Sequence, residues 1–315
     1  MKILLLTFTG TGNTKLCGDY IEKHFISFGH EVIHIVYKYD EPLTVNVNDF
    51  DMLGVGYPIH AFNAPEVFYK WMRSLPKVDN MPYFIYKVSG EPFPPNNASS
   101  YHFVKILKKK GYQKKYEKHF LMPYNIMFRY KDEIAKQMYL YLEALTKAYV
   151  IGIINGDAES IKYRFYQKVI SFLLRIEWIA PKVNAPISSM SKKCTKCQMC
   201  LRNCPTGAIY LNKKGRMKFK ASKCTMCMRC TYSCPVNAIR FGIMNPWKVN
   251  GAYRYEAIKN NKDIAPEYIN HSTKGYFKLF NKYFDKQKVL LEKYHIPNPI
   301  EEYLTKNSKN SPILI

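Results

Sequence analysis

Cysteine residues carry the clearest chemical signal in this sequence. Nine are present, and all but one lie between Cys194 and Cys234. Residues 193–211 and 223–241 align without gaps and are identical at nine of 19 positions, so this region contains an internal duplication. Each copy has the spacing C-x2-C-x2-C-x3-C-P. Thiols this dense indicate metal ligation, because a secreted disulfide framework would spread its cysteines along the chain.

The spacing also separates the candidate metals. Structural zinc normally uses two C-x2-C pairs that are a dozen or more residues apart. Here four cysteines occur within 11 residues, and this happens twice. Three thiolates two residues apart wrap one cubane iron–sulfur cluster in a tight loop, and the fourth ligand comes from elsewhere in the chain. The pattern therefore favours two [4Fe-4S] clusters over zinc.

Residues 186–243 resemble the bacterial-type two-cluster ferredoxins, because eight cysteines and the prolines Pro205 and Pro235 match their pattern. In that pattern the fourth cysteine of each copy binds the cluster of the other copy. The resemblance implies one-electron transfer at low potential. The predicted ligands are Cys194, Cys197, Cys200 and Cys234 for cluster 1, and Cys224, Cys227, Cys230 and Cys204 for cluster 2.

A second candidate site lies at the start of the chain, where an apolar run is followed by TFTGTGNTK at residues 7–15. A nucleoside-triphosphate loop needs a lysine directly after its second glycine, but Gly12 is followed by Asn13. The dinucleotide fingerprint needs a third glycine where Lys15 stands. With these two patterns excluded, residues 7–15 still offer threonine hydroxyls, backbone amides and the N-terminus of the following helix. Such groups together bind a terminal phosphomonoester.

This loop resembles the FMN phosphate loop of the flavodoxins, which has the pattern T/S-x-T-G-x-T. The resemblance implies that the bound phosphate is that of FMN. The matching residues, and thus the predicted phosphate ligands, are Thr9, Gly10, Thr11, Gly12, Asn13 and Thr14.

The rest of residues 1–155 alternates between strand-like and helix-like patterns. Five such strands predict an α/β fold, a flavodoxin-like doubly wound five-stranded parallel sheet with its ligand at the carboxyl ends of the strands. The expected strands are 2–8, 32–36, 52–57, 83–88 and 119–123, and the expected helices are 13–28, 64–74, 98–110 and 131–154.

The loops after the third and fourth strands, residues 56–65 and 88–100, should cradle the flat isoalloxazine ring of FMN. Such a ring is held by stacking and by hydrogen bonds to its polar edge. Ordinary loop packing is the alternative for each aromatic side chain. The candidate ring contacts are Tyr57, His60, Phe62, Asn63, Ser89, Gly90, Glu91 and Phe93.

Four parts are expected along the chain. Apolar residues at helical spacing in 161–180 predict a connecting helix that packs under both domains, with attachment to a membrane surface as the alternative. The C-terminal part is expected to fold back over one of the domains. The predicted parts are a flavodoxin-like FMN-binding domain (1–158), a connecting helix or linker (159–184), a small α+β dicluster ferredoxin domain (185–244) and a helical, basic and aromatic extension (245–315).

The charge of the chain limits its partners. It has 48 Lys+Arg against 24 Asp+Glu, a formal charge of +24, which favours acidic redox proteins such as ferredoxin or an oxidoreductase. A lysine-rich surface without any partner is the alternative. No motif for nucleic-acid binding appears. No apolar run reaches the ~18 residues of a transmembrane span, and the first residues do not form a signal peptide, so a cytoplasmic location is expected.

These features predict an electron carrier rather than an enzyme, in which FMN exchanges electrons with two [4Fe-4S] clusters and links low-potential partners. The second hypothesis is a flavin-dependent oxidoreductase that reduces a small molecule or quinone with electrons from the clusters. It predicts an open pocket walled by His60, Phe62 and Phe93. The third is a scaffold or maturation protein with structural clusters.

Overall fold

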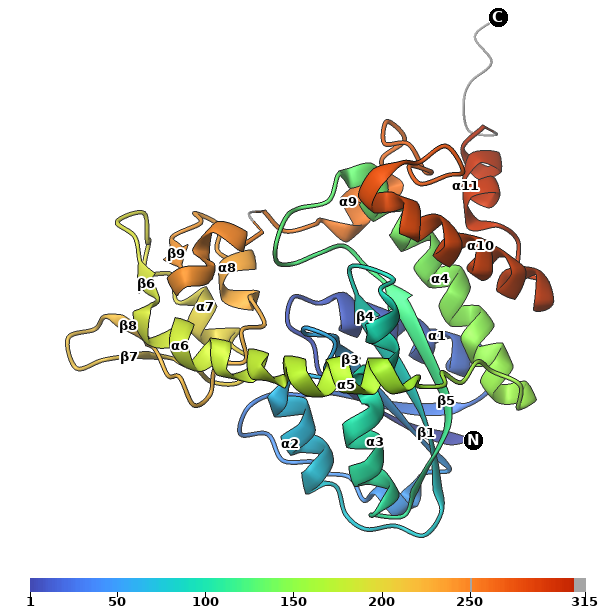
Figure 1. Ribbon diagram of the computed structural model, residues 1–315, viewed down its shortest axis with the longest axis horizontal. Helices are drawn as coiled ribbons and strands as arrows, with labels where there is room; N and C mark the ends of the chain where they lie inside the picture. Colours follow the sequence, from blue (N-terminus) through green and yellow to red (C-terminus); the bar gives the residue numbers. More distant parts are fainter. Residues whose placement is uncertain (250, 309–315) are drawn as a thin grey trace, which may run out of the picture.

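The computed structural model describes residues 1–249 and 251–308 (Figure 1). A parallel five-stranded sheet forms the first part of the chain, with the strand order β2-β1-β3-β4-β5. This order is that of the flavodoxin-like doubly wound fold, as the sequence predicts. The strands are β1 (Lys2–Thr7), β2 (Glu31–Val36), β3 (Met52–Pro58), β4 (Met81–Ser89) and β5 (Tyr112–Leu121).

Helices cover both faces of this sheet. Successive side chains of a strand point to opposite faces, so β1 can be apolar throughout. Ile3 and Leu5 lie in the core under α1 and α4, whereas Leu4 and Leu6 lie in the core under α2 and α3. The helices are α1 (Asn13–Ser27), α2 (Glu66–Ser74), α3 (Tyr101–Lys108) and α4 (Asp132–Asn155).

Strand β5 begins earlier than the sequence predicts, at Tyr112 rather than residue 119. The missed part is the basic stretch that contains Lys114 and Glu117. Its charges are paired inside the protein, where Lys87 Nζ on β4 lies 2.7 Å from Glu117 Oε1 and both side chains are fully buried. Lys114 Nζ lies 2.7 Å from the other carboxylate oxygen. Paired charges of this kind let a strand that looks polar in sequence be buried.

The ferredoxin module follows as two small antiparallel sheets, β6 with β9 and β7 with β8. A short helix follows the first cysteines of each copy, α7 (Met199–Arg202) in the first and α8 (Arg229–Tyr232) in the second. The small core of the ferredoxin module contains Ala185, Ile209, Phe219 and Ile239, with cysteine side chains packed around them. The strands are β6 (Ser189–Met190), β7 (Ile209–Leu211), β8 (Met217–Phe219) and β9 (Ile239–Arg240).

The C-terminal extension is helical and returns to the flavodoxin-like domain, where it packs on α4 (Figure 1). The buried Lys136 on α4 donates hydrogen bonds to the carbonyl oxygens of Asn261 and Ile264, at 2.6 and 2.8 Å. Residues 250 and 309–315 of the predicted extension lie outside the described residues. The described elements are η4 (Gly242–Trp247), α9 (Tyr255–Asn260), η5 (Gly275–Phe277), α10 (Lys278–Lys293) and α11 (Pro299–Ser308).

The chain leaving the ferredoxin module is held against the segment that follows β5. Met127 N donates to Trp247 O at 2.6 Å, and Ile126 forms an antiparallel bridge with Lys248. Tyr253 also joins the two parts, because its hydroxyl accepts from Tyr130 N at 2.5 Å. These contacts hold the C-terminal end of the module against the flavodoxin-like domain, and the connector holds its N-terminal end.

The connector, residues 165–187, enters the ferredoxin module from the other side. It consists of α5 (Phe165–Leu173), η3 (Leu174–Ile179) and α6 (Ala180–Ile187). The expectation that its apolar side packs under both domains is wrong, because Phe165 is 81% and Ile176 66% exposed. The polar side faces inward instead, since Ser171 Oγ donates to Asn63 Oδ1 at 3.0 Å and Ser171 O accepts from Asn63 Nδ2 at 2.8 Å. No helix within the described residues is long and apolar enough to cross a membrane.

Candidate functional site

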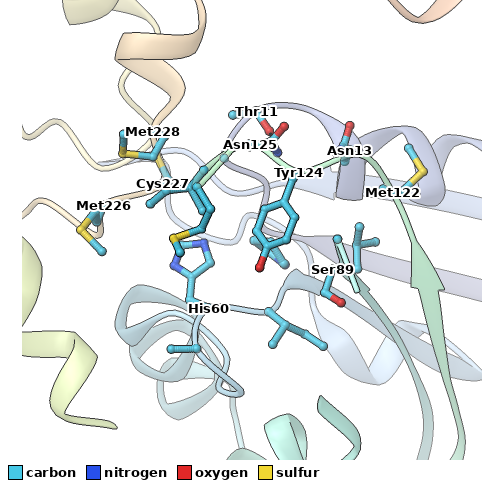
Figure 2. Close-up of a pocket in the computed structure, with 18 of the residues that line it drawn as sticks. Thr11, Asn13, His60, Ser89, Met122, Tyr124, Asn125, Met226, Cys227 and Met228 are labelled. Atoms are coloured by element: carbon cyan, nitrogen blue, oxygen red, sulfur yellow. The ribbon is translucent and has the colours of Figure 1, made fainter. Parts of the chain in front are cut away.

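A pocket of about 440 Å³ opens at the carboxyl end of the sheet, between the flavodoxin-like domain and the ferredoxin module. Figure 2 shows that Thr11 and Asn13 border it on one side, while Cys227 from the ferredoxin module lies opposite Tyr124 and Ser89. Ligand pockets favour this end of a doubly wound sheet. Its walls come from residues 9–11, 13–14, 58–62, 88–91, 122–127 and 226–228, with further contributions from Asn96, Glu177, Ala180 and Met244, whereas the predicted ligand Gly12 does not line it.

The loop at residues 9–14 has the features of an anion site. Gly12 has φ +114°, which only glycine adopts readily, and its amide donates to Thr9 Oγ1 at 3.1 Å. Helix α1 begins directly after it without a side-chain cap or an acidic residue in its first turn. The Thr14 hydroxyl is buried and has no hydrogen-bond partner among the described residues. An uncapped helix N-terminus with an unsatisfied hydroxyl fits a phosphate group.

The segment after β5 fixes this loop from the other side. Asn13 Nδ2 donates to Pro123 O at 2.9 Å, and Asn125 Nδ2 donates to Thr11 Oγ1. Asn125 Oδ1 is buried without a partner in the described part of the chain. Two unsatisfied polar atoms therefore lie at the same end of the pocket.

Five of the predicted ring residues line the pocket, namely His60, Phe62, Ser89, Gly90 and Glu91. Burial lowers the pKa of His60 to about 4, so its imidazole is neutral at neutral pH. Burial also raises the pKa of Glu91, although a hydrogen bond from the Tyr124 hydroxyl opposes this shift. The imidazole of His60 therefore adds no charge to this wall of the pocket at neutral pH.

Three of the predicted ring residues lie elsewhere. Tyr57 is fully buried between Phe68 and Phe103, and its hydroxyl bonds to Ser99. Asn63 is fully buried and holds the connector through Ser171, while Phe93 packs against Phe62 and Tyr276 outside the pocket lining. Strand alternation explains Tyr57, because its side chain points toward α2 and α3.

The segment after β5 also lines the pocket, although the sequence patterns do not point to it. Tyr124 OH donates to Glu91 Oε1 at 2.6 Å, and its ring lies so close to Gly90 that a Cβ there would be 2.5 Å from Tyr124 Cδ2. Only glycine therefore lets Tyr124 reach this position. No local pattern marks Tyr124 or Asn125, since their role depends on β5 lying beside β4.

The ferredoxin module supplies another wall that our sequence-based predictions omit, made by Met226, Cys227 and Met228, and we call it the methionine wall (Figure 2). Gly10 of the phosphate loop packs directly on this wall, because a Cβ at Gly10 would be 2.7 Å from the Cys227 carbonyl oxygen. Arg229 Nε also donates a hydrogen bond to Gly10 O. A predicted ligand of cluster 2 therefore contacts the predicted phosphate loop.

The cysteines gather in two groups that mix the two copies. Cys194, Cys197 and Cys200 of the first copy line one small cavity together with Cys234 of the second. Cys204 of the first copy lies near enough to raise the pKa values of Cys224, Cys227 and Cys230 electrostatically. Both groups correspond to the crossed ligation that the spacing predicts.

Burial is the main reason that these thiol pKa values are high, about 12 for Cys224 and about 11 for Cys227. Thiolates in such surroundings need nearby positive charge, which cluster iron provides. Backbone amides also reach the sulfur atoms, since Ala208 N donates to Cys204 Sγ and Ala238 N donates to Cys234 Sγ, both at 3.2 Å. The residues present therefore fit iron–sulfur clusters.

The connector contributes one carboxyl group to the pocket. Glu177 lines it together with Ala180, on the inward side of the connector, where the neighbouring Trp178 packs against Tyr69. Burial raises the pKa of Glu177 to about 8, so this carboxyl is mostly protonated at neutral pH.

The strand order of the first domain defines a flavodoxin-like fold. Residues 193–238 match the family model of the 4Fe-4S dicluster domain. The chain thus joins a flavodoxin-like domain to a dicluster ferredoxin domain, and the prediction of two [4Fe-4S] clusters is confirmed.

No curated protein matches the chain. Among solved structures, a short-chain flavodoxin associated with a PDU bacterial microcompartment is 20% identical and covers 50% of this chain and 99% of its own, with a TM-score of 0.34. A mutant flavodoxin from Pseudomonas aeruginosa has 12% identity, the same coverages and a TM-score of 0.38. A flavodoxin from Streptococcus pneumonia TIGR4 has 17% identity, coverages of 38% and 84%, and a TM-score of 0.31. The assignment of the flavodoxin-like fold rests on the strand order and not on these similarities.

Proposed function

We propose that this protein transfers electrons between FMN, bound in the pocket, and the two [4Fe-4S] clusters. The single observation that carries the proposal is the double role of Cys227, which belongs to a cluster-binding loop and also lines the pocket. Bound FMN can store one or two electrons, while each cluster passes one, so the pair connects two-electron with one-electron chemistry.

The chain's own residues fit each part of FMN. Residues 9–14 offer the phosphate group backbone amides, threonine hydroxyls and the N-terminus of α1. Tyr124, His60 and Phe62 provide aromatic surfaces for the ring, and Ser89–Glu91 provide polar groups for its edge. Met226 and Met228 close the wall on the side of the ferredoxin module and limit the access of water.

The order of the clusters follows from their surroundings. The loop that carries Cys227 packs on Gly10, so cluster 2 is the one nearer to FMN. The corresponding loop of the first copy is exposed at Cys197, so cluster 1 faces external partners. Electrons would thus pass between the pocket and a docked protein by way of cluster 2 and then cluster 1.

An acidic redox protein is the partner that this arrangement favours. The exposed loop around Cys197 carries Lys193 and Lys196, and the β7–β8 hairpin of the same module carries Lys213, Lys214 and Arg216, all of them exposed. With a formal charge of +24, the chain also attracts acidic proteins at long range. Ferredoxins and acidic oxidoreductases have the required charge.

A flavin-dependent reduction of a small molecule or quinone is the second candidate. It is favoured by Glu177 in the pocket, a carboxyl that is mostly protonated at neutral pH and positioned to donate a proton. This candidate requires steady turnover of a small substrate with a low-potential electron donor, whereas the carrier requires a protein acceptor.

The proposal is tested by the anaerobic absorbance spectrum of the purified protein, with extracted flavin, iron and acid-labile sulfide measured on the same sample. About eight irons and one FMN per chain are expected, and both chromophores should bleach on reduction. Eight irons without flavin would overturn the proposal and leave the pocket to another anionic ligand.

A further inference from the structure

The outer side of the connector carries large apolar side chains that no other element covers within residues 1–249 and 251–308, and we call it the connector face. Phe165 is 81%, Ile176 66% and Phe172 59% exposed. Large apolar side chains that cluster on the surface mark binding sites, whereas scattered ones do not. The members of the connector face are Phe165, Tyr166, Val169, Phe172, Leu173, Ile176, Ile179, Val183 and Ile187.

The spacing of these residues places them on one side of the connector. Their core recurs at intervals of four and three residues, from Phe165 through Val169, Phe172, Ile176 and Ile179 to Val183. Such intervals keep side chains within one stripe of a helix. At about 1.5 Å per residue, the stripe from residue 165 to 187 is roughly 35 Å long. In Figure 1, α5 and α6 run across the molecule from the flavodoxin-like domain to the ferredoxin module.

A row of basic residues borders this stripe. Arg164, Lys168, Arg175 and Lys182 are separated by four, seven and seven residues, which puts them along one edge of the same helical surface. Arg164 and Lys182 are exposed and Lys168 is half-buried, whereas the half-buried guanidinium of Arg175 packs against the rings of Trp178, Tyr69 and Phe172. Glu177 is the only acidic residue from 161 to 187, and it lines the pocket on the inward side. The outward side of the connector therefore combines apolar side chains with positively charged ones and carries no acidic residue.

The combination of apolar and basic side chains on the connector face indicates what binds there. A second copy of the chain would bring together two molecules of formal charge +24 and two basic rows, which repel each other. A surface that is both apolar and negatively charged meets the two requirements at once, and an anionic lipid bilayer is such a surface. Helices with bulky apolar residues on one side and Lys or Arg at the border lie in the plane of the membrane interface.

We propose that the connector face docks this protein peripherally on an anionic membrane surface. Apolar side chains of residues 165–187 would enter the headgroup region, and Arg164, Lys168 and Lys182 would contact the lipid phosphates. This inference is independent of the proposed electron transfer, because its test reads binding alone.

The test is flotation of the full-length, cluster-loaded protein with vesicles of phosphatidylcholine alone and of phosphatidylcholine mixed with phosphatidylglycerol. The protein should float with the mixed vesicles at least tenfold more than with the neutral ones, and the bound fraction should fall as salt increases. Equal flotation with both vesicles, or none with either, would overturn the proposal.

Two matched pairs of variants distinguish vesicle binding through the connector face from nonspecific binding through other exposed apolar or basic residues. The triple variant Phe165→Ser, Phe172→Ser, Ile176→Ser should lose at least tenfold in vesicle binding, whereas Ile26→Ser, Val289→Ser, Leu304→Ser, at similarly exposed positions, should bind normally. Arg164→Glu with Lys182→Glu should weaken binding, whereas Lys213→Glu with Lys214→Glu, the same change in net charge, should not. An unchanged cluster spectrum would show that each variant is folded.

Self-association is the competing outcome. Sedimentation of the unmodified protein without lipid should give a monomer at all salt concentrations. A dimer that the three serine substitutions abolish, or vesicle binding that all variants retain, would contradict membrane docking and assign the connector face to another role.

Discussion

The two cysteine loops come from one duplicated sequence but lie in different surroundings. In the first loop, Thr195, Lys196, Cys197 and Gln198 are all exposed. In the second, the corresponding Thr225, Met226, Cys227 and Met228 are buried or half-buried against the flavodoxin-like domain. The backbones correspond, since Lys196 and Met226 have φ +59° and +54°, and Gln198 and Met228 both have +59°.

The difference shows how a duplication acquires two roles without changing its ligands. The cysteines that are the predicted cluster ligands have the same spacing in both copies. Two polar residues of the first copy, Lys196 and Gln198, are methionines in the second, and those methionines line the pocket. The copies thus differ in what surrounds the cluster, which sets solvent access and potential.

The largest effect is expected from removing one ligand in each loop. Cys197→Ser and Cys227→Ser should each lower the iron content from about eight toward about four per chain. Only Cys227→Ser should also lower the FMN content, because the Cys227 carbonyl packs on Gly10. Iron and flavin analysis of both purified variants checks this. Equal flavin content in the two would show that the second loop does not support the phosphate loop.

The contact itself is tested by Gly10→Ala. The new methyl group would lie 2.7 Å from the Cys227 carbonyl oxygen, so one of the two loops must shift. FMN affinity should fall at least tenfold, about 1.4 kcal/mol, and the electron paramagnetic resonance signal of cluster 2 should change while that of cluster 1 is retained.

Lys15→Ala is the matched control, since Lys15 follows the predicted phosphate loop but is exposed, and its side chain bonds to Asp19 and to no other of the described residues. Its FMN affinity should stay within about twofold of the unmodified protein. Similar losses in both variants would mean that the loop is sensitive to any change and not to the Cys227 contact.

An exchange between the loops should give a smaller effect. Met226→Lys places an ammonium group in the wall of the pocket, where desolvation is costly, and should weaken FMN binding by severalfold. Lys196→Met changes the equivalent exposed position and should leave FMN binding unchanged. Quenching of flavin fluorescence measures both. If both variants bind FMN equally well, the methionine wall does not contribute to binding.

The smallest effect concerns the pH dependence of the pocket. The pKa of Glu177 is raised by burial from its usual range to about 8, so this carboxyl is neutral below that pH and ionises above it. A new negative charge near an anionic ligand opposes binding, so FMN affinity should fall two- to threefold from pH 7 to pH 9.

Glu177→Gln should remove this pH dependence while keeping the affinity that the unmodified protein has at pH 7. The stability of the fold should also decrease as the pH rises. Between about pH 4.5 and pH 8 the folded chain keeps a proton on Glu177 that the unfolded chain has lost. The free energy of unfolding should therefore decrease with rising pH in that window, and a free energy that stays constant there would show that Glu177 is exposed in solution.

The sequence predicts the features that depend on local spacing. The cysteine groups and the alternation of strands and helices follow from patterns within short windows, and the assignment of residues 9–14 as a phosphate loop, which rests on the same kind of pattern, stays a prediction. The early part of β5 escapes such reasoning, because Lys114 and Glu117 look like surface residues until Lys87 on a neighbouring strand pairs with them.

Contacts between distant segments explain the other differences. Helical periodicity identifies the residues that share the connector face, but not whether that face points inward. The hydrogen bonds between Asn63 and Ser171 decide its direction. The methionine wall did leave a signal, because aligning the two copies shows Met226 and Met228 where the first copy has polar residues. Tyr124 left none.

The attachment of the ferredoxin module at both ends has a consequence for the rate of the proposed electron exchange between FMN and the clusters. A module on a single flexible linker must search for its docking position before every transfer, and that search slows in viscous solution and depends on salt. Here the connector and the Met127–Trp247 contact hold the module on two sides, so that search is completed once, when the chain folds. Exchange within one molecule should then be insensitive to viscosity and ionic strength, whereas exchange with an outside protein should depend on both.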